Sequence, residues 1–240
     1  MKRLKGIIFP TLTFIVVLFV AASIYLIFKS NYYLTVYVDG ISMQPTLNAN
    51  YESGVSDGTY SYQENVEFGE VDQSKKAINN IERFDIVTTY YPWDNKDYEQ
   101  PYAKQSQHLK NADYKIKRVI ALPGETFKME NNDLYIGYND EESGYNWEKI
   151  EIKFDRNLDD NKNIESTTLG KDEYWVMGDN YGHSNDSSNH NGGEQAPIYK
   201  ENITGVLVSI KGSCTVKTKL SNNKVSIVNK KYYSKEKIYF

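Results

Sequence analysis

Two side chains far apart in the sequence could together perform acyl-transfer chemistry. Ser42 lies in the string Asp-Gly-Ile-Ser-Met-Gln-Pro-Thr-Leu at 39–47, behind the flexible Gly40 and ahead of a proline that restricts the preceding backbone. Lys117 lies in an alternating apolar stretch, where loss of hydration lowers the pKa of an amine and leaves more of it uncharged near neutral pH. An uncharged amine can take the proton from a serine hydroxyl, which is otherwise a poor nucleophile. The sequence therefore predicts a nucleophile and base pair if folding brings Ser42 and Lys117 together.

Each of these residues also has a simpler interpretation. The string around Ser42 is compatible with an ordinary turn followed by a strand. A lysine in a half-buried strand can extend its ammonium group to the edge of the sheet. The single cysteine, Cys214, excludes an intramolecular disulfide, and its apolar, alternating surroundings favour a buried structural thiol over a nucleophile.

A third stretch, Gly-Asp-Asn-Tyr-Gly-His-Ser-Asn-Asp-Ser-Ser at 178–188, is typical of a loop that lines a site, because Gly and Asn permit positive φ and close backbone approach. His183 and Asp186 in this loop could form a Ser-His-Asp triad, and together with His190 they could bind a metal ion. The close ligand spacing of a zinc site is absent, and we expect neither a metal nor a cofactor. Asn202-Ile203-Thr204 matches a glycosylation acceptor by letter only.

The elements that would position these groups are mostly strands. The 21 tyrosines, together with runs of Val, Ile and Thr, favour strands over helices. Strands are predicted at 33–38, 83–92, 114–125 (ending in a turn), 173–177, 203–210 and 215–219, with a small antiparallel lobe at about 126–172. In the strand that carries Lys117, alternation places Arg118 on the opposite face. Three polar segments are predicted. They are 48–80, with at most two short strands near 60–62 and 66–68, a loop at 94–111, and 155–171. The sequence does not predict whether the basic tail at 222–240 is ordered.

The N-terminal segment predicts a membrane anchor. Residues 6–28 carry no charge and are long enough, as a helix, to cross about 30 Å of hydrocarbon. Lys2, Arg3 and Lys5 precede this segment and Lys29 alone follows closely, which predicts a cytoplasmic N-terminus and an extracytoplasmic remainder. A cleaved secretory signal is the alternative, although its apolar region usually spans only about 7 to 15 residues.

The remainder of the chain has the composition of a soluble domain. Charged residues make up 25% of the 240 residues, and the mean hydropathy is −0.63. The net charge of −4, without a basic stripe interleaved with aromatics, argues against a nucleic acid partner. This length accommodates an anchor and one sizeable domain.

Four strings, in this order behind one apolar segment, resemble the successive conserved boxes of type I signal peptidases. They are Ser-Met-Gln-Pro-Thr-Leu at 42–47, Arg-Phe-Asp-Ile-Val at 83–87, Lys-Arg-Val-Ile-Ala-Leu-Pro-Gly-Glu at 117–125, and Met-Gly-Asp-Asn at 177–180 with Ser184 and Asp186. The resemblance implies a mostly β, antiparallel domain that removes signal peptides from exported precursor proteins at the outer face of the membrane. It also implies selection of small residues at the first and third positions before the cut.

The resemblance further implies roles for individual residues. Ser42 would be the nucleophile and Lys117 the general base. The main-chain amide of Ser42 would stabilise the oxyanion, because the family position that can carry a serine donor is Gly40 here. Ser184 would orient the lysine amine, and Arg118 with Asp179 would form a supporting ion pair.

Two arginines that the family commonly has in the last box are Tyr181 and Ser188 here, so Asp186 is expected to lose its partner and the loop to be looser. This departure suggests a specialised relative that serves a narrow set of surface proteins such as pilus components. It also motivates an alternative function, a membrane-anchored assembly factor that binds such proteins without cutting them. The expected organisation is a cytoplasmic segment at 1–5, a membrane helix at 6–28, a catalytic domain at 29–221 and a tail at 222–240.

Overall fold

The computed structural model describes residues 2–91, 93, 114–140, 144–190 and 193–238. The loop predicted at 94–111 lies outside the described residues. The chain divides into two compact units, Met1–Leu34 and Thr35–Phe240.

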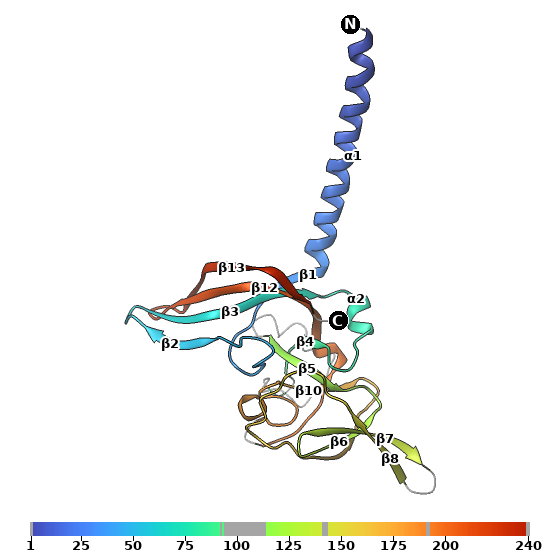
Figure 1. Ribbon diagram of the computed structural model, residues 1–240, viewed down its shortest axis with the longest axis vertical. Coiled ribbons are helices and arrows are strands. Elements are labelled where there is room, and N and C mark those ends of the chain that lie inside the picture. Colours follow the sequence, from blue (N-terminus) through green and yellow to red (C-terminus); the bar gives the residue numbers. More distant parts are fainter. Residues whose placement is uncertain (1, 92, 94–113, 141–143, 191–192, 239–240) are drawn as a thin grey trace. The chain divides into compact units, whose positions relative to one another are not determined.

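The first unit is dominated by one helix, α1, over Lys2–Tyr32 (Figure 1). Its segment Thr11–Tyr32 has a mean hydropathy of 2.6 and is not buried within the protein, so it is long and apolar enough to cross a membrane. Phe28 and Tyr32 pack together near its end, with ring centroids 4.7 Å apart. These properties agree with the predicted apolar helix at 6–28 and are consistent with a membrane anchor.

The second unit is built almost entirely from antiparallel strands, which confirms the mostly β fold class. Its strands are β1 (Tyr33–Tyr37, beginning in the first unit), β2 (Glu52–Ser56), β3 (Tyr60–Asp72), β4 (Ile86–Thr89), β5 (Lys115–Ala121), β6 (Thr126–Glu130), β7 (Asp133–Asp140), β8 (Gly144–Ile150), β9 (Ile164–Thr168), β10 (Glu173–Met177), β11 (Ile198–Tyr199), β12 (Ile203–Lys219) and β13 (Lys224–Ile238). The short helix α2 (Lys75–Asn79) and the 3-10 turns η3 (Tyr181–His183) and η4 (Lys200–Asn202) complete it.

Within the described ranges, nine strands form the main sheet in the order β1-β3-β12-β4-β5-β10-β11, with β2 beside β3 and β13 beside β12 (Figure 1). Strand β12 organises this sheet. It pairs with β3 along one edge, and along the other it pairs first with β4 and then with β13. Val206 shows both edges in use, because it is paired with Asp72 of β3 and with Val87 of β4.

A smaller sheet lies in the interval predicted as an inserted lobe. It has the order β8-β7-β6-β9 among the described residues, and it lies on the far side of β5 and β10 from β12 and β13 (Figure 1). Its buried side chains, among them Phe127, Met129 and Leu134, share one core cluster with Ile120 of β5 and Trp175 of β10. The lobe therefore packs against the strand that carries Lys117.

Three expectations about strands were wrong in detail. The segment 48–80, expected to be mainly solvated, contains β2 and the 13-residue strand β3, because pairing with β12 satisfies the backbone of a polar sequence. The predicted strand at 83–92 is only Ile86–Thr89 in its described part, since Phe84 has a φ of +76°. The two strands predicted at 203–210 and 215–219 are one strand, β12, whose register shifts absorb the interruption.

The tail, whose order the sequence left open, forms β13 and pairs with β12. Strand β9 likewise occupies part of the polar segment at 155–171.

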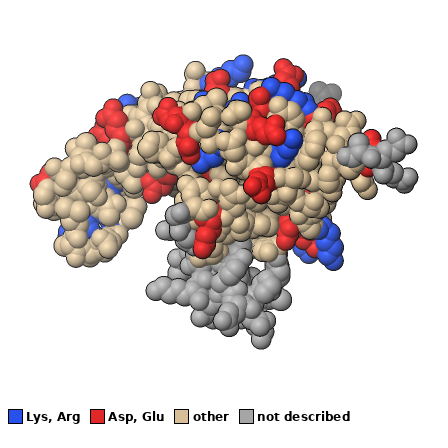
Figure 2. All heavy atoms as spheres, turned by 90° about the horizontal axis from the view of Figure 1, so that it is seen from below, with Lys and Arg blue, Asp and Glu red and all other residues tan. Residues whose placement is uncertain are grey.

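Acidic and basic side chains are interspersed on the face of the molecule shown in Figure 2. No single-sign stripe crosses that face among its described residues, in agreement with the near-balanced composition.

Candidate active site

Ser42 lies in the turn that follows β1, and Asn180 from the loop after β10 holds this turn by two hydrogen bonds. The main-chain amide of Asn180 donates to the Ser42 carbonyl at 3.0 Å, and its side-chain Nδ2 donates to the Ile41 carbonyl at 3.1 Å. Because the Ile41 carbonyl and the Ser42 amide belong to one planar peptide, the second contact also fixes the direction of the Ser42 N–H. Among the described residues, no acceptor binds that N–H. The amide is thus oriented and available.

Lys117 reaches the Ser42 hydroxyl from β5. Its Nζ lies 2.7 Å from Ser42 Oγ and donates to the Ile116 carbonyl at 3.1 Å. The side chain is 4% exposed. The pKa of Lys117 is lowered from 10.5 to about 8; burial is the main cause, Lys115 adds to it, and the carboxylates of Asp186 and Asp179 act in the opposite direction. A substantial fraction of the amine is therefore uncharged slightly above neutral pH, and its lone pair can accept the Ser42 proton.

Arg118, next to Lys117 in the strand, is held in a buried ion pair. Its Nε and Nη2 donate to the two carboxylate oxygens of Asp179 at 2.8 and 2.7 Å. Its Nη1 donates to the Phe84 carbonyl, and the guanidinium lies 3.8 Å from the centroid of the Phe154 ring. The structure thus brings together the pair expected from the family resemblance. It links β5 to the start of the loop that contains Asn180.

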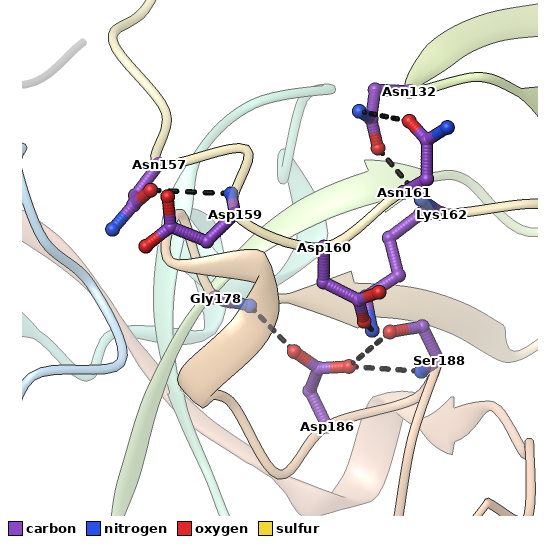
Figure 3. A network of polar contacts seen from close by, with 9 residues as sticks. All are labelled: Asn132, Asn157, Asp159, Asp160, Asn161, Lys162, Gly178, Asp186 and Ser188. Atoms are coloured by element: carbon purple, nitrogen blue, oxygen red, sulfur yellow. Dashed lines mark hydrogen bonds and ion pairs between the residues drawn. The ribbon is translucent and has the colours of Figure 1, made fainter.

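Asp186 has no arginine partner at position 188, as expected, but other donors bind its carboxylate. Its Oδ2 accepts from the main-chain amide of Gly178 at 2.8 Å, and its Oδ1 accepts from the amide and hydroxyl of Ser188 at 2.9 and 2.7 Å (Figure 3). Ser188 stands at one of the positions where an arginine was expected. Because a charged carboxylate is well satisfied by several N–H and O–H donors, the loop is closed without that arginine.

Tyr181, at the other expected arginine position, is 2% exposed and packs into the core cluster of the small sheet. Its hydroxyl lies 3.3 Å from Nη1 of Arg156, which also donates to the Asn132 carbonyl at 2.8 Å. An arginine therefore does reach this part of the loop, but from the segment before β9. Asn132 also anchors the neighbouring polar cluster with Asn161 and Lys162 (Figure 3).

The structure does not place Ser184 in the expected hydrogen bond with Lys117. The Ser184 hydroxyl is buried and has no hydrogen-bond partner within the described part of the chain. It does lie at the site, because a side chain added to Gly178 would collide with Ser184 Oγ and with the Ser42 carbonyl. Gly178 is therefore required for the close approach of these two loops.

The alternative chemistries considered from the sequence gain no geometric support. Ser42 Oγ forms a hydrogen bond with Lys117 Nζ, and among the described residues it forms none with a histidine. His190 instead stacks on Trp93, with centroids 4.1 Å apart, and its Nε2 lies 3.6 Å from Glu194. In the described ranges, no group of three His, Cys, Asp or Glu side chains could hold a metal ion. Cys214 is buried, as expected of a structural thiol.

A cleft of about 450 Å³ opens onto the dyad of Ser42 and Lys117. It is lined by residues 35–39, by Ser42 and Met43, and by residues 114–117 at the start of β5. A larger cavity of about 750 Å³ lies between α2, the start of β10 and η4, and it contains neither member of the dyad. We take the smaller cleft as the candidate active site because, of these two, it alone is lined by both Ser42 and Lys117.

Comparison with known proteins identifies the family. The family model described as signal peptidase, peptidase S26, matches residues 11–211. The chain belongs to this signal peptidase family. The resemblance inferred from the four strings is therefore confirmed.

Individual relatives are distant. Signal peptidase I V of Bacillus subtilis strain 168 is 26% identical over 185 residues, which cover 75% of this chain and 86% of that protein. Signal peptidase I P of Bacillus subtilis subsp. natto is 34% identical over 91 residues, which cover 38% of this chain and 47% of that protein, so the chain spans about half of its length. A solved signal peptidase I from Enterococcus faecalis V583 aligns with 53% of this chain and 97% of that one at 22% identity, with a TM-score of 0.34.

Two residues of the site were not predicted from their side chains. Asn180 belongs to the string at 177–180, and the resemblance implies no role for its side chain, which nevertheless orients the Ser42 amide. Asn48 lies directly after the string at 42–47, in the segment predicted to be solvated, but it is only 1% exposed. Its positive φ of 58° follows the proline-containing turn and is common for asparagine.

Proposed function

We propose that this chain is a serine endopeptidase that removes N-terminal signal peptides from exported precursor proteins, with Ser42 as nucleophile and Lys117 as general base. The single observation that carries the proposal is the 2.7 Å separation of Ser42 Oγ and Lys117 Nζ in a buried setting. Membership of the signal peptidase family supports the substrate class.

The reaction follows from the geometry. The uncharged Lys117 amine takes the hydroxyl proton as Ser42 Oγ attacks the scissile carbonyl carbon. The negative charge on the carbonyl oxygen is stabilised by the Ser42 main-chain N–H, which Asn180 holds in place. The Lys117 ammonium then protonates the leaving amine, and an ester links Ser42 to the signal peptide. Water, deprotonated by the same amine, hydrolyses this ester and regenerates the site.

The cleft suits an extended peptide segment. Strand β1 is an edge strand of the main sheet, and residues 35–38 form one wall of the cleft. A substrate can add to such an edge through main-chain hydrogen bonds, which bring its scissile bond to Ser42. Small side chains before the cut fit subsites that are filled in part by the buried side chains of Val36, Val38 and Met43.

We also propose the membrane setting expected from the sequence. Helix α1 anchors the chain with its N-terminus in the cytoplasm, and the β domain works at the extracytoplasmic surface of the lipid bilayer of the cell membrane. There it meets precursors as they emerge, and surface proteins such as pilus components are among the candidate substrates. The basic residues Lys2, Arg3 and Lys5 support this orientation.

The test uses the full chain, purified in detergent and incubated with a precursor protein. Wild type is expected to release the signal peptide, and Ser42→Ala and Lys117→Ala each to lose processing. Ser53→Ala, at an exposed position of β2, is the matched control. Full processing by Ser42→Ala would show that Ser42 is not the nucleophile. Binding of the precursor by wild type without any cleavage would favour the assembly factor instead.

A further inference from the structure

Behind the nucleophile turn, Asn48 and Glu67 form a closed pair of buried polar residues. The Asn48 amide donates to Glu67 Oε2 at 2.8 Å, and the Glu67 amide donates to Asn48 Oδ1 at 2.8 Å. Their side chains are 1% and 4% exposed. A buried carboxylate is costly unless it is well paired, so this pair depends on the donors around it.

The Asn48 side chain, which this pair holds in place, also binds the main chain just before Ser42. Its Nδ2 donates to the Val38 carbonyl at 2.6 Å and to the Gly40 carbonyl at 2.9 Å. Gly40 has a φ of +83°, and among the described residues, apart from Gly40 and its two chain neighbours, no atom lies within 4 Å of the position that a Cβ would occupy. Because glycine is conformationally free and this side of it is unpacked, hydrogen bonding rather than packing must hold the Gly40 peptide in place.

The other oxygen of Glu67 is occupied by the C-terminal strand. Tyr233 Oη donates to Glu67 Oε1 at 2.9 Å, and Lys237 Nζ donates to the same oxygen at 2.7 Å. Burial, together with the Glu67 charge, raises the pKa of Tyr233 to about 12, so its hydroxyl keeps its proton at neutral pH. The chain of contacts therefore runs from β13 through Glu67 and Asn48 to Gly40.

We propose that Tyr233 and Lys237 are positioning residues for the peptidase reaction, which act through Glu67 and Asn48 on the main chain that leads into Ser42. This inference rests on the proposed function. Its importance follows from Gly40 itself, because this position offers no side-chain donor to the oxyanion and the backbone has to supply the stabilisation. Small shifts of the Gly40 backbone then displace the Ser42 amide and reduce kcat more than they raise KM.

The experiment compares Tyr233→Phe, Lys237→Met and the double variant in the full chain, with a precursor as substrate. The controls are Tyr232→Phe and Lys235→Met, at neighbouring positions of β13 whose side chains are exposed and do not hydrogen-bond to Glu67. We expect the double variant to lose about tenfold in kcat, with KM changed by no more than about twofold and the pH midpoint of the rate unchanged. Both controls should stay within about twofold of wild type. Lys237→Arg should retain wild-type kcat, because a guanidinium can still donate to Glu67.

Two results would overturn the proposal. One is a double variant whose kcat equals that of the controls. The other is a loss of kcat that disappears when each variant is assayed the same number of degrees below its own Tm, which would indicate only a structural role. Ser42→Ala is assayed in parallel. If this variant still processes the precursor, the proposed function itself is wrong. If Ser42→Ala is inactive and the double variant is unimpaired, only the positioning role is refuted.

Discussion

The two faces of β5 carry adjacent basic residues in opposite electrostatic conditions. Lys117 is buried with a serine hydroxyl and a carbonyl as its hydrogen-bond partners, and burial dominates its lowered pKa. Arg118 is equally buried, at 5% exposure, but a carboxylate binds it through two parallel hydrogen bonds. One residue is left able to lose its proton, and the other is fixed as a cation.

This difference suits two neighbouring residues to different roles: Lys117 to proton transfer and Arg118 to holding the structure together. A buried amine without a directly bound counter-ion costs stability, and the cost is what makes it a base near neutral pH. The neighbouring guanidinium, which cannot be deprotonated in a protein, is suited to hold the loop at 178–180. If the comparison is correct, removing the two cations should change stability in opposite directions.

The largest effect is expected from Lys117→Met. If Lys117 is the general base, as proposed, its loss should reduce processing by about 10²- to 10⁴-fold. The same change should raise the free energy of unfolding, because the folded protein no longer holds an amine whose pKa lies at about 8 rather than 10.5. At about 1.4 kcal/mol for each pKa unit, the gain is on the order of 3 kcal/mol.

The pH dependence of that gain follows from the direction of the shift. The unfolded chain binds the Lys117 proton more tightly, so the destabilisation is complete below about pH 8 and vanishes as pH rises through 10.5. Urea unfolding of wild type and variant at pH 7 and at pH 10.5 measures it, with Lys235→Met as the exposed control. If Lys117→Met is less stable than wild type at pH 7, burial of the Lys117 amine does not destabilise the folded protein, and the inferred lowering of its pKa is wrong.

The opposite sign is expected for Arg118→Met. This variant leaves Asp179, which is 1% exposed, buried without its partner, and it should lower the free energy of unfolding by about 3 to 5 kcal/mol. Replacing both residues, with Arg118→Met and Asp179→Leu, should recover much of the loss, because no buried charge then remains unpaired. Urea unfolding at pH 7 tests both variants. A single variant that costs less than about 1 kcal/mol would show that the pair is not the support inferred here.

Part of this site could be predicted from the sequence because its signals are local. Period-2 alternation around Lys117 identifies the strand and assigns Arg118 to its other face, and the strings at 42–47 and 177–180 identify the loops. The contact between Ser42 and Lys117 spans 75 positions and depends on the order of strands in the sheet. Only the family resemblance, not residue spacing, could predict that contact.

The partners of Asp186 and the order of the tail could not be predicted for physical reasons. Two of the donors to Asp186 are main-chain amides, of Gly178 and Ser188, and a side-chain pattern does not reveal them. The segment with β3 reads as polar because much of its stability comes from backbone pairing with β12. Strand β13 depends on the same partner, so its contact with Glu67 was not visible until the sheet was known.

The smallest effect concerns the charges that tune Lys117. The rate of processing should rise with pH to a plateau with a midpoint near 8, as the Lys117 amine loses its proton. Asp186, the second influence after burial, raises the pKa of Lys117, so Asp186→Asn should move this midpoint to lower pH by a fraction of a unit. Ser188→Ala keeps the Asp186 charge and removes one hydrogen bond, and it should leave the midpoint unchanged. Rates measured between about pH 6 and 10 on a soluble peptide substrate separate the two variants. A midpoint that moves equally in both would mean that loop geometry, rather than the Asp186 charge, sets the basicity of Lys117, and the contrast between the two faces of β5 would then need a different physical cause.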